Sequence, residues 1–448
     1  MATVGRYPPG PPAVWPGGQL WAFRRDALGL YTRLARDYGD IVAYRLGTQR
    51  SVLLNHPEYM RDVLVTQQRQ FTKSQALQWA KDILGDGLLT SEGEVHVRQR
   101  RLVQPAFSRQ RLPQYGAIMV AGAVRLRHRW QEGVTLNMDQ EMTHLMLAIA
   151  GKLLFDADME AEASDIGAAV TALLQLFPRF MLPWSRVLSK VPVPSTRRAA
   201  WARHHLDTVI ARLIQERRAH PDNAGDLLSL LLTAQDEAGD GGGMSDHQLR
   251  DEVLTLLLAG HETTAALLTW TWYLLSQHPA VEARLHAELD TVLAGRLPTV
   301  ADLPQLQYSR MVLAETLRLY PPAWIIGRRT VAPYTVGGYV LPPQTNVLMS
   351  PYVLHRDARF YPEPERCDPH RWTPEAAAAR PPFTFLPFGA GARQCVGEGF
   401  AWMEGLLALA TLAQHWQGRL VPGHAVALRP LLTLRPKHGM RMTVARRS

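Results

Sequence analysis

The sequence is short of cysteine, with only Cys367 and Cys395 among its 448 residues. Two cysteines exclude a scaffold held by several disulfides and are compatible with a reducing cytoplasm. They are also too few to hold an iron–sulfur cluster. Hydrophobic residues make up 46% and charged residues 20% of the chain, and the 33 glycines and 32 prolines follow no collagen-like period. Disordered and fibrous classes are therefore excluded, and we expect a globular protein with a large core.

Long apolar runs are missing as well. The best uncharged stretch, from Thr263 to Gln277, is shorter than a bilayer-spanning helix and contains Thr, Ser and Gln. The first residues, M-A-T-V-G-R-Y, contain no apolar signal core. We therefore expect a cytoplasmic protein with no membrane span. Acidic residues are the minority charge, and the formal charge of +9 favours an acidic partner, a nucleic acid or an anionic surface without choosing among them.

Length alone suggests about three domains. The motifs described below must meet at one place, however, so we expect a single domain over residues 1–448 with a Pro- and Gly-rich lead-in at 1–20. The patterns predict a mainly α protein with a smaller β-rich part. Helices are expected at Ala27–Tyr38, near Gln305–Leu319 and near Val396–His415, and breaks at Pro178–Pro194 and Gly239–Gly243. Short strands are expected at Ile41–Leu46, Ser51–Leu54, Arg329–Val331, Tyr334–Val336, Tyr339–Leu341 and Asn346–Ser350.

One predicted helix is unusually long. Ser245 with Gln248 three residues later forms a capping box, and the apolar pattern runs from there to about Gln277, where His278-Pro279 stops it. At some 32 residues, this helix would be roughly 48 Å long. It could therefore cross a whole domain.

The strongest motif is F-G-A-G-A-R-Q-C-V-G, from Phe388 to Gly397. Its glycines let the backbone turn tightly and approach a flat ligand. Cys395 directly precedes a predicted helix, and both the helix N-terminus and the nearby Arg393 favour thiolate over thiol. A lone cysteine is more often a buried structural residue. The complete spacing F-x-x-G-x-R-x-C-x-G argues against that interpretation here.

This loop resembles the haem-binding motif of the cytochromes P-450, and the resemblance covers nearly the whole chain with motifs in the family's order. It implies the cytochrome P-450 fold, in which heme b (iron protoporphyrin IX) lies between the long central helix and the cysteine loop. Cys395 would be the iron ligand, since a thiolate pushes electron density toward the metal and favours O–O cleavage. Phe388 would form an apolar wall beside the haem, and Arg393 would pair with a propionate.

The segment A-G-H-E-T-T, from Ala259 to Thr264, lies in the middle of the long helix. A mid-helix glycine costs about 1 kcal/mol relative to alanine, and a Thr hydroxyl that bonds back to the preceding turn can open a groove. The segment resembles the family's oxygen-activation motif, which implies that Ala259 lies against the haem, Thr263 holds dioxygen and water, and Glu262 relays protons. A zinc-protease interpretation is rejected because H-E-x-x-H would need histidine at Ala265.

Further cofactor contacts follow from the resemblance. His96 and Arg100 lie one helical turn apart on one face and match the family's propionate-binding pair. Arg328 lies where another propionate arginine is found, and Gly397 follows the ligand cysteine. Solvated basic residues are the alternative interpretation for all three side chains.

Glu315 and Arg318 place opposite charges at i and i+3 of one helix. Alone they would be interpreted as a surface ion pair. In context they resemble the family's pair that braces the haem loop, with Arg371 as its third member, although His370 and Trp372 depart from the family's usual residues. Cys367 is interpreted as a small core residue.

Arg98, Arg101, Arg109 and Arg111 form a basic cluster that could meet an acidic electron donor. No nucleic-acid-binding motif accompanies it, so no nucleic-acid partner is expected. A solvated face is an equally good interpretation.

The resemblance also outlines a substrate cavity, lined by the loop after Phe71, Leu256–Thr263, Ala323–Ile326 and Leu431–Thr433. These residues are mostly apolar, which predicts an apolar small-molecule substrate. Arg318–Arg329 and Ser350–Arg356 look similar to a thermophile branch that hydroxylates carotenoid rings, and A-G-H-E-T-T is shared with bacterial fatty-acid hydroxylases. We rank a carotenoid or terpenoid above a fatty acid.

The expected function is a haem-thiolate monooxygenase that inserts one atom of dioxygen into its substrate. A ferredoxin or flavodoxin with its reductase would supply electrons, since the sequence contains no flavin or iron–sulfur segment. The alternatives left open are a peroxide-driven peroxygenase, a haem-based gas sensor, for which no output domain is found, and a haem-free scaffold.

Overall fold

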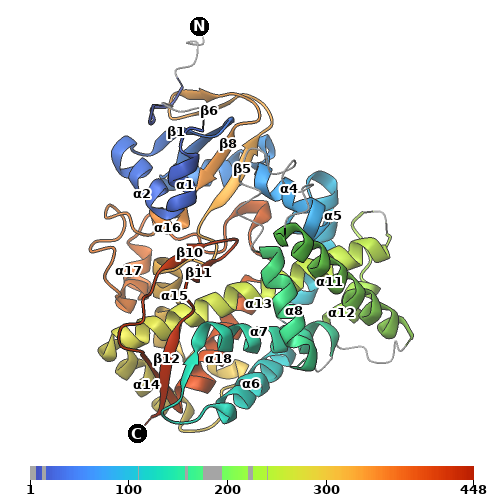
Figure 1. Ribbon diagram of the computed structural model, residues 1–448, viewed down its shortest axis with the longest axis vertical. Helices are drawn as coiled ribbons and strands as arrows, with labels where there is room; N and C mark the ends of the chain where they lie inside the picture. The colour runs from blue at the N-terminus through green and yellow to red at the C-terminus, as the bar shows by residue number, and fades with distance from the viewer. Residues whose placement is uncertain are drawn as a thin grey trace.

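The computed structural model describes residues 7–12, 17–108, 110–156, 160–174, 194–219, 226–239 and 241–447. These residues form a helical body with a β-rich part beside the N-terminal segment (Figure 1), which confirms the mainly α prediction. Arg109, parts of the predicted lead-in and nearly all of the predicted break at Pro178–Pro194 lie outside the described residues. The break at Gly239–Gly243 falls, as far as it is described, between α12 (Leu227–Thr233) and α13 (Asp246–Gln277).

The main sheet has five strands in the order β1-β2-β8-β5-β3. Its strands are β1 (Ile41–Leu46), β2 (Gln49–Leu54), β8 (Asn346–Met349), β5 (Ile326–Thr330) and β3 (Phe71–Lys73). Only the β2–β8 pair is parallel. The strand predicted at Arg329–Val331 overlaps β5, but β5 begins three residues earlier, where Ile326 pairs with Met349 of β8, and ends at Thr330. That pairing joins segments whose register the local pattern does not encode.

Helix α13 is the centre of the helical body and crosses it from one side to the other (Figure 1). Ser245 is its N-cap, both capping-box hydrogen bonds are present, and it ends at Gln277 with His278 as C-cap, as predicted. Its length and apolar composition would suit a membrane span, but 83% of its most apolar window is buried inside the molecule. The core therefore accounts for its apolar composition.

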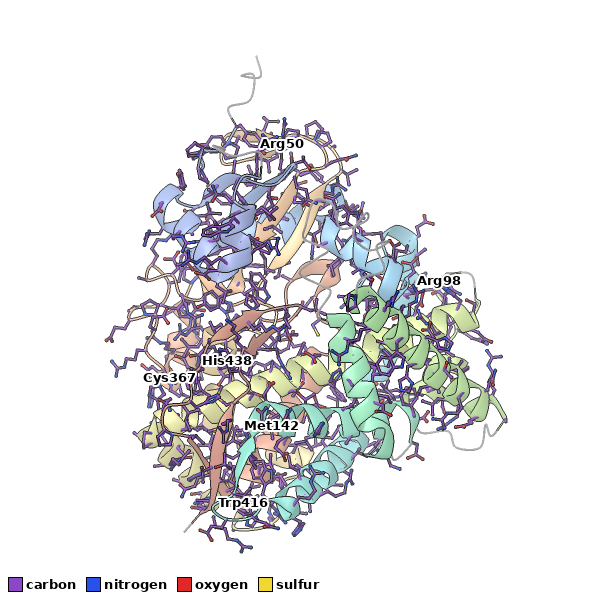
Figure 2. All side chains as sticks on the ribbon, in the orientation of Figure 1. Arg50, Arg98, Met142, Cys367, Trp416 and His438 are labelled. Atoms are coloured by element: carbon purple, nitrogen blue, oxygen red, sulfur yellow. The ribbon has the colours of Figure 1, made fainter. Side chains whose placement is uncertain are left out.

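Helices on both sides of α13 complete the body. They include α7 (Met138–Phe155), α6 (Leu112–Arg129), α15 (Gln307–Leu319) and α18 (Glu398–Ala413). Met142 and Trp416, marked in Figure 2, belong to this core and are almost fully buried. The other elements, in chain order, are α1 (Leu20–Arg25), α2 (Ala27–Tyr38), α3 (Pro57–Arg61), α4 (Gln75–Leu84), α5 (Gly93–Val103), β4 (Thr135–Asn137), α8 (Glu160–Leu174), α11 (Pro194–Ala219), α14 (Pro279–Leu293), β6 (Tyr334–Val336), β7 (Tyr339–Leu341), α16 (Pro351–Leu354), α17 (Pro374–Ala378), β9 (Trp416–Leu420), β10 (Leu428–Pro430), β11 (Leu434–Pro436) and β12 (Arg441–Arg446).

Candidate active site

The cysteine loop turns as its glycines require. Gly389 and Gly391 have φ of 69° and 75°, in the left-handed region that favours glycine. A Cβ at Gly391 would lie under 3.0 Å from the carbonyl of Leu64, so the loop also needs glycine for close packing. The N–H of Cys395 donates to the carbonyl of Phe388 (3.0 Å), which fixes the cysteine after the turn.

The expected cause of thiolate formation is not found. The sequence suggested that Arg393 and a helix N-terminus lower the pKa of Cys395, but Arg393 pairs with Glu92 (Nη1–Oε1 3.0 Å) and α18 begins only at Glu398. Cys395 is exposed to the cavity, but the protein packed around it raises its pKa, and a hydrogen bond from the Gly397 N–H offsets only part of this effect. Coordination to a metal deprotonates a thiol outright, so the metal itself would supply the missing stabilisation.

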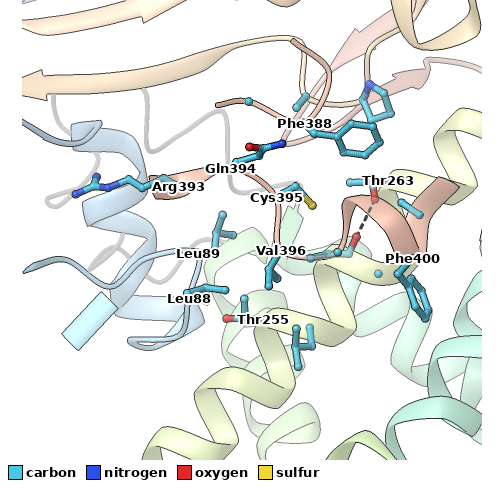
Figure 3. Close-up of a pocket in the computed structure, with 18 of the residues that line it drawn as sticks. Leu88, Leu89, Thr255, Thr263, Phe388, Arg393, Gln394, Cys395, Val396 and Phe400 are labelled. Atoms are coloured by element: carbon cyan, nitrogen blue, oxygen red, sulfur yellow. Dashed lines mark hydrogen bonds between the residues drawn. The ribbon is translucent and has the colours of Figure 1, made fainter. Parts of the chain in front are cut away.

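A cavity of about 400 Å³ lies between this loop and α13. Figure 3 shows the Cys395 sulfur turned toward the side on which Thr263 lies, with Phe388 and Phe400 beside it. Every predicted cofactor-binding residue lines this one cavity: His96, Arg100, Ala259, Arg328, Phe388, Arg393 and Gly397. Residues distributed over 302 positions of the chain, from 96 to 397, are therefore brought together.

One edge of the cavity concentrates buried positive charge. Lys73 of β3 and Arg328 of β5 are direct partners in the strand register, although their side chains are only 5% and 9% exposed. Like charges in such positions repel each other. Arg393 adds a third cation, and Glu92 is the carboxylate that pairs with it. This excess of buried cations suits a ligand edge that carries two carboxylates, as the propionates of haem do.

His96 contributes a neutral group to the same edge. Burial, followed by the charges of Lys73 and Arg393, lowers the pKa of His96 to about 4. Its Nε2 is buried and has no hydrogen-bond partner among the described residues, which leaves it available to a propionate. Arg100 lies one turn further on, and its Nη1 donates to the carbonyl of Gln394 (2.7 Å), next to the cysteine.

Sequence reasoning missed Lys73 and Glu92. The backbone N–H of Lys73 donates to Glu92, which also holds Arg393, so the two residues connect β3 to the cysteine loop. No local pattern marks either residue, because each acts through a distant segment: Lys73 faces Arg328 across the sheet, and Glu92 pairs with Arg393.

The hydroxyl of Thr263 donates to the carbonyl of Ala259 (2.8 Å), as predicted for a threonine that bonds back to the preceding turn (Figure 3). Glu262 differs from the expectation, since it is not among the described residues that line the cavity. Its Oε2 accepts a hydrogen bond from Thr433 (3.0 Å) and lies 4.0 Å from Arg435. Burial alone would raise the pKa of Glu262, but Arg435, His261 and Thr433 together lower it to about 2.

The apolar wall of the cavity differs in part from the prediction. Leu88, Leu89, Leu256, Ala323, Ile325 and Ile326 line it. Trp324 and Leu431–Thr433 were also expected there but are not among the described lining residues. The indole N–H of Trp324 donates to the carbonyl of Leu431 (2.9 Å), so these segments bind each other behind the wall.

Glu315 and Arg318 form a buried network and not a surface pair. Both are fully buried, and Arg318 Nη2 lies 2.8 Å from Glu315 Oε1. Arg371 lies 3.6 Å from the same carboxylate, and the indole N–H of Trp372 donates to it (2.9 Å). Trp372, a departure from the family's usual residue, thus supplies a hydrogen-bond donor. Arg318 also donates to the carbonyls of His355, Pro364 and Arg366, which ties α15 to the segment before the cysteine loop.

Cys367 lies beside this network and is half-buried (Figure 2). Burial raises the pKa of Cys367 to about 12, so it remains a thiol.

The predicted basic cluster is partly occupied by internal contacts. Arg101 Nε donates to Asp236 (2.7 Å), and Arg98 donates to the carbonyls of Gly242 and Gly243 (3.0 and 2.8 Å). These two arginines fasten α5 to the connection between α12 and α13. Arg98 lies at the edge of the molecule in Figure 2.

Comparison with known proteins identifies the class. The family model "Cytochrome P450" matches residues 8–440, so the chain belongs to the cytochrome P450 family. Cytochromes P450 bind haem, iron protoporphyrin IX, and are oxidoreductases. The fold agrees: a solved structure described as retinoic acid bound cyanobacterial CYP120A1 superposes with a TM-score of 0.89 at 26% identity, covering 99% of this chain and 100% of that one.

Curated relatives narrow the comparison. The chain is 42% identical to cyclooctatin synthase of Streptomyces melanosporofaciens, with 89% of this chain and 87% of the relative covered. It is 38% identical to cyclooctat-9-en-7-ol 5-monooxygenase of the same organism, with 94% and 91% covered. It is also 36% identical to pentalenene oxygenase of Streptomyces avermitilis, with 100% and 98% covered.

Proposed function

We propose that this protein is a monooxygenase that inserts one atom of dioxygen into an apolar terpenoid. The observation that carries the proposal is the shared cavity, in which the sulfur of Cys395 and the hydroxyl of Thr263 meet a wall of leucine, isoleucine and alanine. Such a wall binds an apolar molecule by removing its surface from water. The named activities of the three Streptomyces relatives support a terpenoid over a fatty acid.

The residues have separate roles in this proposal. Cys395 ligates the iron, and Arg100, His96, Arg328 and Arg393 bind the propionates. When bound, the haem supplies the iron at which dioxygen is reduced. Phe388, Ala259 and Gly397 shape the space around the macrocycle.

Thr263 handles water and protons inside the cavity. Its hydroxyl hydrogen is directed to the Ala259 carbonyl, so its oxygen lone pairs would accept a hydrogen bond from a water held in the cavity. Glu262 is proposed to exchange protons with this region only after its carboxylate leaves Thr433 and Arg435, because it lies outside the cavity in this conformation. Such an acid–alcohol pair delivers protons without flooding the site with water.

Electrons are proposed to come from a separate ferredoxin or flavodoxin and its reductase, in the cytoplasm. The positive net charge of the chain favours an acidic donor. A peroxide-driven enzyme would turn over with peroxide and not with reduced ferredoxin, so comparing the two rates tests this part of the proposal.

The substrate class is tested with a panel of cyclic terpenes, carotenoids and fatty acids, each titrated into the haem-loaded protein. Binding next to the iron is followed by the spin-state shift of the haem spectrum, and products are then identified after turnover with ferredoxin. We expect the largest shift and hydroxylated products with cyclic terpenes. A shift produced only by fatty acids or polar compounds would contradict the proposal.

A further inference from the structure

The segment between α4 and α5, residues 85–92, covers one side of the cavity, and we name it the cavity loop. The side chains of Leu88 and Leu89 line the cavity, next to Thr255 of α13 (Figure 3). The loop lies very close to α13, since a Cβ at Gly85 or Gly87 would meet Asp251 or Thr255 at under 3.0 Å. The position of Leu88 and Leu89 therefore depends on how this backbone is attached.

Two buried titratable side chains, those of Glu252 and Lys73, hold the backbone of Leu88. Its N–H donates to Oε2 of Glu252 (3.0 Å), which belongs to α13 and is fully buried. Its carbonyl accepts from Nζ of Lys73 (2.8 Å), which belongs to β3 and also donates to the carbonyl of Ser91 (2.7 Å). A carboxyl group and an amino group from two different elements thus hold both polar groups of a single residue.

Burying Glu252 and Lys73 to hold Leu88 costs free energy. Burial raises the pKa of Glu252 to about 7 and lowers the pKa of Lys73 to about 7, because removal from water disfavours the charged form of each group. Oε1 of Glu252 has no hydrogen-bond partner among the described residues. Buried charged groups add little net stability over apolar replacements, whereas they fix a geometry well.

We propose that Glu252 and Lys73 are positioning residues for the substrate: by holding Leu88 at its N–H and its carbonyl, they fix Leu88 and Leu89 as one wall of the cavity and set which apolar molecule fits. This inference rests on the proposed function, because it takes the cavity to be the substrate site. Lys73 also lies 3.4 Å from Nδ1 of His96, so the wall and the propionate edge share one residue.

The test compares two substitutions of the same residue in the haem-loaded protein. Glu252→Leu removes the acceptor of the Leu88 N–H, whereas Glu252→Gln keeps an amide oxygen in its place. Glu288→Gln is the control, because Glu288 of α14 accepts from the backbone N–H of Ser309 (2.8 Å), and neither residue is among the described residues that line the cavity. Hydrogen exchange at the Leu88 amide reports the attachment without any substrate. Spin-state titration with a cyclic terpene reports the wall, and titration with imidazole reports haem access in general.

We expect Glu252→Leu to lose at least about tenfold in Leu88 protection and in terpene affinity, as for a lost buried hydrogen bond. Glu252→Gln and Glu288→Gln should stay within about threefold of the natural protein, and imidazole affinity should be unchanged in all three variants. Unchanged protection in Glu252→Leu, unchanged terpene affinity despite lost protection, or an equal loss of imidazole affinity would each overturn the inference. If Glu252→Leu does not load haem, Glu252→Asp, whose shorter side chain draws the carboxyl group away from the Leu88 N–H, is judged by the same criteria. If the natural protein binds no terpene, the proposed function fails, while exchange at Leu88 still tests the attachment.

Discussion

Glu404 of α18 shows how much a single residue contributes to the behaviour of this fold. It is almost fully buried, and its Oε2 has no hydrogen-bond partner within the described ranges. Burial raises the pKa of Glu404 to about 8, and the Thr264 hydroxyl offsets part of that effect. Because the folded pKa lies above the ordinary value of 4.5 for a glutamate, the contribution of this group to stability is complete below pH 4.5 and is lost as the pH rises toward 8.

Glu404→Gln keeps the shape of the side chain and removes its titration. We expect the variant to be increasingly more stable than the natural protein between pH 5 and 8, by up to about 1.4 kcal/mol per pH unit. Denaturant unfolding at several pH values measures this difference. Glu375→Gln, at an exposed position of α17, serves as the control and should leave the pH dependence unchanged. A constant difference between Glu404→Gln and the natural protein across this range would contradict the assignment.

Thr263 is the second residue whose role is open to direct test. Thr263→Val keeps the branched shape but removes the hydroxyl that faces Ala259. We expect about tenfold less product per electron pair consumed, since proton delivery in the cavity is impaired. Substrate-induced spectral shifts should stay as they are, because the apolar wall is untouched. Equal product yield in the variant and the natural protein would remove Thr263 from the mechanism.

At the scale of elements, the buried network around Glu315 joins α15 to the chain segment that leads into the cysteine loop. One carboxylate accepts from Arg318, from Trp372 and from the N–H of Asp368 (2.8 Å), and Arg318 has no exposed surface. Removing the negative charge would leave the buried guanidinium of Arg318 without a counter-charge. This change costs more free energy of unfolding than the intact pair contributes.

Glu315→Gln is therefore expected to destabilise the protein by about 3–5 kcal/mol. Trp372→Phe removes one hydrogen bond to the same carboxylate and should cost about 1–3 kcal/mol. Denaturant unfolding of both variants ranks them. A Glu315→Gln variant as stable as the natural protein would show that the network does not support the fold.

Elements also show where local sequence is sufficient. The ends of α13 were predictable because Ser245, Gln248 and His278 determine them locally. The start of β5 was not, because Ile326 gains its strand partner from β8. The start of α18 was placed two residues too early, since the turn after Cys395 continues to Gly397.

At the scale of the whole molecule, the motifs predicted the cavity but not what holds it together. Each predicted cofactor-binding residue belongs to a motif that resembles the family's. Lys73, Glu92 and Glu252 instead act through hydrogen bonds between distant segments. The same reason explains the misplaced Leu431–Thr433 segment, which lies behind Trp324. Arg98 and Arg101 were predicted to belong either to a docking site for an acidic donor or to a solvated face, and the structure adds contacts of both with the segment before α13.

The net charge of +9 leads to a prediction about the electron donor. If an acidic ferredoxin docks on this protein, the rate of its reduction should fall several-fold between about 10 mM and about 500 mM salt, as screening shortens the reach of the charges. Stopped-flow reduction under both conditions measures this, with a small neutral reductant as the control. A rate independent of salt would exclude electrostatic docking.

The measurement that tests the central claim most directly is the absorption spectrum of the reduced, haem-loaded protein under carbon monoxide. With the sulfur of Cys395 as the iron ligand, the natural protein should show the red-shifted band characteristic of thiolate ligation, and Cys395→Ala should lose it. Absence of this band in the natural protein, or its persistence in Cys395→Ala, would contradict the account.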